Sequence, residues 1–281
     1  MLATGQVELE VFDPRPQTAH PFPWPIGAFL DVMPESVLEI PPPMTPMALE
    51  HPSYDLVVLA WQPWYLSPSL PVTAFLASEA AKVLQSTPVV VLCACRNMWH
   101  AGWLKLKARL DQLGARVLDH VVLVDQGAAW ATFVTTPRWL WTGKQNAFGP
   151  FPAAGVSEKD IAALAPLGER LRDAVVQGRL ESSVMKGASP APLSVVRKYV
   201  LPEFLASHVF RWWAHSVRAA GSVWKGFRLP VEVVFFTWLY AMIIMLLPIL
   251  VLTAIVVRVG FKGWFNARVS LLAAPSGGEV S

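Results

Sequence analysis

Charged residues are scarce in this sequence: Asp, Glu, Lys and Arg make up 15% of its 281 residues, against about 25% in a typical soluble protein. The deficit is concentrated after Pro230, so the chain joins two regions of different composition. The net charge is only +3, and the basic residues do not gather into a stripe with aromatic side chains between them. These features exclude the usual kind of nucleic-acid-binding surface.

Cysteine is scarcer still, with Cys93 and Cys95 as the two in the chain. They lie two residues apart in an apolar run, so on a strand both would point to one face, in poor geometry for a disulfide. We therefore expect reduced thiols in a cytosolic compartment. Residues 1–16 also lack the basic and apolar regions of a secretory leader, which predicts that the N-terminal part stays in the cytoplasm.

Signatures of metal and nucleophile chemistry are missing as well. The six histidines do not have metal-ligand spacing, and the sequence contains neither a G-x-S-x-G elbow nor a P-loop. The sequence therefore predicts no metal site and identifies no catalytic residue.

What the sequence does have is a long apolar run near its C-terminus, uncharged from 233 to 257. A helix of this length exceeds the roughly 30 Å hydrocarbon thickness of a bilayer, so we predict one transmembrane helix at 231–259. Trp238 near one end and Trp264 beyond the other suit the two membrane interfaces. Pro248 would kink this helix or mark the tip of a re-entrant hairpin. A core helix is the alternative.

The segment 201–227 mixes Trp, Phe and Leu with basic residues, as in a helix that lies among lipid headgroups. The alternative is a helix packed on the N-terminal domain. The expected organisation is an α/β domain at 1–180, a linker and amphipathic Trp-rich helix at 181–230, the transmembrane helix, and a short basic tail at 260–281. The expected location is the inner (cytoplasmic) membrane, with membrane lipid as a partner and the α/β domain in the cytoplasm.

Four short β-rich runs divide the N-terminal domain, at 7–12, 54–61, 87–95 and 120–127. Helical patterns lie between the later runs, at 72–84 and 102–115, and Ser157 with Asp160 resembles a capping box that opens a helix to about Gly178. Strand, crossover helix and strand in alternation predict a doubly wound parallel sheet.

Two loops follow strand ends, where ligands bind in such sheets. Both combine flat aromatic faces with polar groups, which suits holding a planar ring and hydrogen-bonding its edge. The alternative is that the aromatic side chains only cover the end of the sheet. The candidate binding residues are Gln62, Pro63, Trp64 and Tyr65 in the first loop, and Arg96, Asn97, Met98 and Trp99 in the second.

Several strings within residues 20–175 carry a family resemblance: HPFPWP, YDLVVLAWQPWYLSPSLPVTAFL, CRNMWHAGWLKLKARLDQLGA, VVLVDQG, TTPRWLWTGK and FPAAGVSEKDI. On these motifs the chain resembles the flavodoxin-like superfamily, and more closely the bacterial dialkylresorcinol condensing enzymes. The resemblance implies a flavodoxin-like fold whose two loops, with the eight residues named above, hold FMN. It also implies an oxidoreductase or aromatase that acts on a lipid-like phenolic substrate beside other pathway enzymes.

The sequence departs from this family at its start, because it opens at what would be the second strand of a flavodoxin-like sheet. Leu2 to Gln6 cannot serve as the usual phosphate loop, and a missing first strand would leave exposed edges inside the sheet. We expect either a natural start upstream of Met1 or an N-terminally truncated relative. The two hypotheses are a membrane-anchored oxidoreductase or aromatase of dialkylresorcinol or aryl-polyene lipid biosynthesis, and a non-catalytic membrane adaptor with a cofactor-free scaffold.

Overall fold

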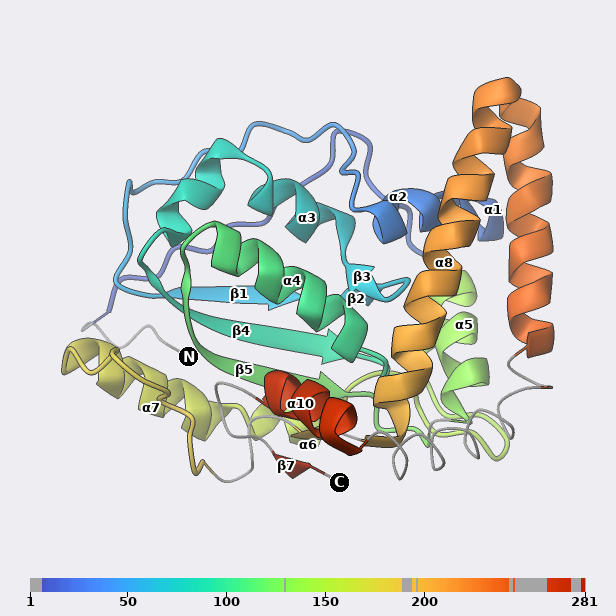
Figure 1. Ribbon diagram of the computed structural model, residues 1–281. Helices are drawn as coiled ribbons and strands as arrows, with labels where there is room; N and C mark the ends of the chain where they lie inside the picture. The colour runs from blue at the N-terminus through green and yellow to red at the C-terminus, as the bar shows by residue number, and fades with distance from the viewer. Residues whose placement is uncertain are drawn as a thin grey trace.

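The computed structural model describes residues 7–128, 130–188, 194–195, 197–242, 245, 262–273 and 279–280. In this part the chain is a mixed α/β protein with a small parallel sheet. The sheet consists of β1 (Val57–Trp61), β4 (Pro88–Cys95) and β5 (Arg116–Val124), side by side in that order (Figure 1).

Three of the four predicted strands are confirmed, and the strand predicted at 7–12 is wrong. That segment is irregular, and its alternation does not mark a buried face, since Leu9 and Val11 are exposed while Phe12 packs on the core. Within the described chain this segment pairs with no strand of the sheet, whereas β1 pairs directly with β4, with Val57 beside Val89. The exposed edges that a missing first strand would leave inside the sheet are therefore absent, because β1 and β4 are adjacent.

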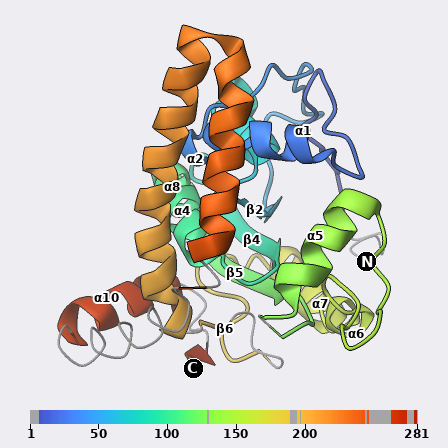
Figure 2. The same ribbon diagram turned by 90° about the vertical axis from the view of Figure 1, so that its right-hand side faces the viewer.

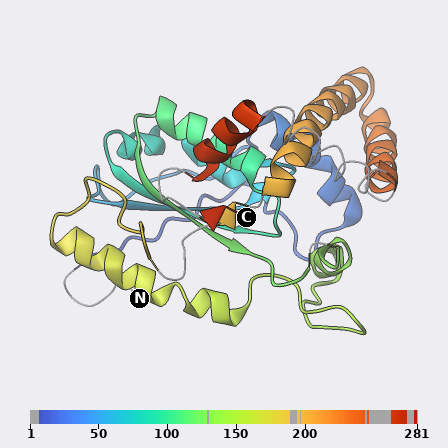
Figure 3. The same cartoon turned by 60° about the horizontal axis from the view of Figure 1, so that its bottom comes forward.

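Helices cover both faces of the sheet (Figures 1 and 3). On one face lie α3 (Leu70–Leu76), the 3-10 helix η1 (Glu79–Leu84) and α4 (His100–Gln112), and on the other lie α6 (Glu158–Ala162) and α7 (Ala165–Val176). Ser157 accepts a hydrogen bond from the Asp160 N–H, which confirms the predicted cap. The single helix expected after it is divided where α7 begins, with Pro166 in its first turn.

The remaining elements surround this sheet. They are α1 (Ile26–Asp31), α2 (Met33–Leu38), β2 (Pro63–Trp64), β3 (Ser67–Pro68), α5 (Thr132–Thr142), β6 (Ser194–Val195), α8 (Arg197–Val223), the 3-10 helix η2 (Lys225–Phe227), α10 (Lys262–Ala273) and β7 (Glu279–Val280). A further helical segment covers 228–242.

The side chains of β4 alternate between two hydrophobic clusters. Val89, Val91 and both cysteines pack toward α4, and Val90 packs toward α7. The prediction that the two cysteines are free and share a face is confirmed. Burial, the neighbouring Cys95 thiol and the Glu203 carboxyl raise the pKa of Cys93 well above its ordinary value, so this thiol stays protonated at neutral pH.

The helix α8 and the segment 228–242 form an antiparallel pair that stands beside the sheet (Figure 2). Phe210, Ala214 and Val217 of α8 join Phe235 in a second cluster, which also contains Met33 from α2. Of the two alternatives for this Trp-rich segment, the one observed is therefore packing on the N-terminal part of the chain.

The prediction of a transmembrane helix at 231–259, and with it the inner-membrane location, is corrected by the structure. Among the described residues, no helix combines the length and the apolar character that crossing a bilayer requires. The helical segment 228–242 carries Arg228 and Glu232 near its start, and both charges make ion pairs there. The rest of the apolar run, at 243–244 and 246–259, lies outside the described residues.

Candidate functional site

The carboxyl ends of β1, β4 and β5 meet at one edge of the sheet, as predicted for a ligand site. After β1 the chain makes the small hairpin of β2 and β3, whose turn puts Tyr65 (φ 48°) and Leu66 (φ 61°) in the left-handed region. Left-handed backbone is costly for such residues and needs support. The Tyr65 hydroxyl donates to the Phe29 carbonyl at 2.6 Å, and Leu66 is buried.

The eight predicted binding residues lie in different surroundings. In the first loop, Gln62 is exposed, Pro63 is partly buried, and Trp64 meets the Trp24 ring edge-on with ring centroids 5.7 Å apart. Tyr65 packs on Phe29 at 5.2 Å.

In the second loop, Asn97 is partly buried, and the Arg96 guanidinium lies 4.2 Å from the centroid of the Phe133 ring. Trp99 is buried against His100. Met98 and Tyr65 both pack on the hydrophobic cluster of Met33 and Phe210 beneath α8. One predicted residue from each loop therefore lies in the same cluster.

These loops do not fit an FMN ring as they lie. A sandwiched isoalloxazine needs free aromatic faces on both sides, whereas Trp64, Tyr65 and Trp99 each pack on another ring of the protein. In the described chain, the segment before β1 also provides no Ser/Thr/Gly-rich loop that opens a helix to hold a phosphate. FMN stays a prediction from the resemblance alone.

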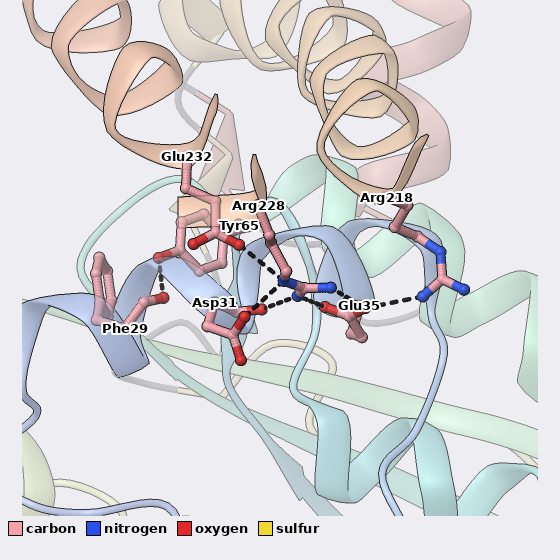
Figure 4. Close-up of polar contacts among 7 residues, drawn as sticks. All are labelled: Phe29, Asp31, Glu35, Tyr65, Arg218, Arg228 and Glu232. Atoms are coloured by element: carbon pink, nitrogen blue, oxygen red, sulfur yellow. Dashed lines mark hydrogen bonds and ion pairs between the residues drawn. The ribbon is translucent and has the colours of Figure 1, made fainter. Parts of the chain in front are cut away.

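An ion-pair cluster holds the segment 228–242 over this edge (Figure 4). The Arg228 guanidinium donates to Asp31 at 2.5 Å, to Glu35 at 2.5 Å and to Glu232 at 3.0 Å. Arg218 of α8 donates to the same Glu35 at 2.8 Å. Both helices of the antiparallel pair are thereby joined to α1 and α2.

A buried acid–histidine pair lies at the start of α4, which follows the end of β4. His100 and Glu203 of α8 are almost fully buried, and His100 Nδ1 lies 2.6 Å from Glu203 Oε1. The other oxygen, Oε2, accepts from the Ala101 N–H at 3.1 Å, where the N-terminal end of a helix favours a negative charge. No sequence motif indicated this pair, although Glu203 is an acid in an otherwise apolar stretch of a helix.

Aromatic rings pack around a second histidine beside this pair. His120 of β5 stacks on Trp103 at 4.0 Å and meets Trp99 edge-on at 5.1 Å. Burial, and then the nearby His100, lower the pKa of His120 to about 3, so its ring is neutral at neutral pH.

His100 also lines a cavity of about 160 Å³ between α4, α8 and α10. The wall is mostly apolar, with a few polar side chains. Its lining residues are His100, Ala101, Leu104, Lys105, Val200, Phe204, Ser207, Arg268 and Leu272. Within the described chain, His100 Nε2 is buried without a hydrogen-bond partner.

One group of acidic side chains and a histidine lies far from this edge. Ligand atoms of Glu10, Glu50 and His51 lie within 4.8 Å of one another. Glu10 already accepts from the Tyr54 hydroxyl and from the Glu50 N–H. Exposed acidic groups of this kind are common without an ion, so we assign no metal to them.

Comparisons with known proteins do not identify a family. The chain matches no family model, no curated protein and no solved structure.

Proposed function

We propose that the protein is an enzyme that moves protons on a small, largely apolar ring ketone, with His100 as the general base. The observation that supports this proposal is the buried pair of His100 and Glu203 at 2.6 Å beside a cavity that His100 lines. Since a carboxylate can only accept, the hydrogen sits on Nδ1, and Nε2 is the nitrogen that takes a proton. A carboxylate behind a histidine also stabilises the imidazolium that forms.

The reaction that suits these groups is keto–enol isomerisation. His100 Nε2 takes a proton from the carbon beside the carbonyl, and the C–H electrons form a C=C bond while the C=O π electrons move to the oxygen. The oxygen then takes the proton back from the His100 imidazolium. No electrons are gained or lost, so no oxidant is required. The choice of a ring ketone rests on the resemblance, because ring ketones become phenols through enols. A cavity of about 150 Å³ in another protein admits benzene, so one ring fits here.

Deuterium exchange tests this proposal without a known substrate. Cyclohexanone in D₂O gains deuterium beside its carbonyl, and NMR measures the rate with and without protein. We expect exchange with the wild type to be faster than in buffer alone. In His100→Asn and Glu203→Gln, the exchange rate above that of buffer should be at least about 100-fold lower than in the wild type. The matched control is His215→Asn, an exposed histidine further along α8.

Two outcomes would count against the enzyme. One is a wild-type rate equal to that of buffer, and the other is full activity in a correctly folded His100→Asn protein. Circular dichroism checks the fold of each variant. Glu203→Gln keeps an acceptor for His100 Nδ1, so this variant changes the charge of the pair more than its packing.

A second candidate is a cofactor-free scaffold that binds a protein partner. It is favoured by Leu205, Val209 and Trp212, which lie along one face of α8 and are 42%, 36% and 62% exposed. Contiguous exposed apolar side chains often mark interaction surfaces. If this candidate is right, cyclohexanone exchanges no faster with the wild type than with buffer.

A further inference from the structure

Arg268 of α10 is a cation in the wall of the cavity defined above. Its guanidinium carbon lies 5.1 Å from the centroid of the Phe204 ring and 5.9 Å from that of Trp264. Its Nε is buried, and the described residues supply it with no hydrogen-bond acceptor. A buried donor of this kind is costly to leave without an acceptor, and more so when it carries charge.

Lys105 and Ser207, two other polar side chains of the wall, already have partners. Lys105 donates to the Val37 carbonyl and to Ser67 Oγ, both at 2.8 Å. Ser207 donates to the Phe204 carbonyl at 2.7 Å. Among the described lining residues, Arg268 is therefore the cation whose hydrogen-bonding capacity is left for a ligand.

We propose that Arg268 binds the carboxylate of a ligand whose single ring packs among the apolar side chains of the cavity. The helices α4, α8 and α10 lie close together around this space (Figure 1). A guanidinium binds a carboxylate by charge-assisted hydrogen bonds, and the apolar wall, with Leu104 and Leu272, suits a ring. This inference rests on the proposed function, and it identifies the substrate as a ring ketone that carries a carboxylate.

Calorimetric titration with benzoate and with benzamide tests the charge requirement. The two probes have the same ring, but only benzoate carries a charge. We expect benzoate to bind the wild type at least about tenfold more tightly than benzamide. Arg268→Met should remove this difference, and Arg268→Lys should keep part of it. The control is Arg170→Met, which changes an exposed arginine of α7.

The proposal is overturned if benzoate does not bind the wild type, if benzamide binds equally well, or if Arg268→Met leaves benzoate binding unchanged. Glu203→Gln separates it from the proposed function, because Glu203 does not line the cavity, so this variant should bind benzoate like the wild type while it loses exchange. Benzoate binding that depends on Arg268 in a protein without exchange activity would support this site and contradict the enzyme.

Discussion

At the scale of single residues, Glu232 is the carboxyl whose environment most changes its titration. Its side chain is 1% exposed and accepts a hydrogen bond from Arg228 at 3.0 Å. Burial raises its pKa from 4.5 to about 7, against the opposing effect of Arg228, and the nearby Asp31 and Glu35 contribute in the same direction as burial. The group therefore changes charge near neutral pH.

This shift predicts a pH dependence of stability. The folded pKa lies above the unfolded one, so the contribution of Glu232 is full below about pH 4.5 and is lost as pH rises through about 7. Between about pH 6 and pH 8 we expect the free energy of unfolding to fall by about 1 kcal/mol more in the wild type than in Glu232→Gln. Urea unfolding at both pH values measures this, and equal changes in the two proteins would contradict it.

At the scale of elements, the attachment of α8 and of 228–242 to α1 and α2 depends on two arginines with unequal surroundings (Figure 4). The Arg228 side chain is 24% exposed and has three carboxylate partners, among them the buried Glu232. The Arg218 side chain is 43% exposed and pairs with Glu35 alone among the ion pairs of the described chain. A buried charge without its partner is costly, whereas an exposed pair contributes little.

The two arginines provide a matched pair of variants. Arg228→Met should reduce the free energy of unfolding by about 3–5 kcal/mol, because it removes the cation that three neighbouring carboxyl groups share. Arg218→Met should reduce it by no more than about 1 kcal/mol. Urea unfolding gives both values, and hydrogen exchange should show the loss of protection in α1, α2 and 228–242. Similar effects of the two variants would contradict this account.

At the scale of the whole molecule, α8 contributes to several parts of the structure. Val200 joins the main cluster of the sheet, Phe210 and Val217 belong to the cluster with Met33, and Glu203 meets His100. These contacts predict that the α/β part depends on α8. The division at residue 180 predicts instead that the α/β part folds alone.

A chain of residues 1–188 distinguishes the two predictions. From the contacts of α8 we expect it to lose cooperative urea unfolding and near-ultraviolet circular dichroism, because Met33 would be uncovered and His100 would have no carboxylate partner. Intact protein under the same conditions is the control. A truncated protein that is monomeric and unfolds cooperatively would show that the α/β part is a self-sufficient domain.

The sequence by itself determined the strands of the sheet, the α4 helix and the Ser157 cap. Their signals lie within short windows: continuous β-branched runs for buried strands, apolar spacing for the helix and a cap residue three positions from its partner. It failed at 7–12, where the alternation is present but the segment pairs with no strand of the described sheet. Local pattern fixes what a segment can form, and a neighbour decides whether it does.

Only the tertiary structure decided the site and the role of the apolar C-terminal region. His100 and Glu203 are separated by 103 positions, so no local spacing reveals a pair that depends on where α8 crosses α4. The predicted loops do lie at the carboxyl edge of the sheet, but Tyr65 and Trp99 in them pack on other rings. Hydropathy likewise counts the uncharged run from Val233 without registering that Arg228, just before it, pairs with Asp31 and Glu35, because these partners lie in a distant segment.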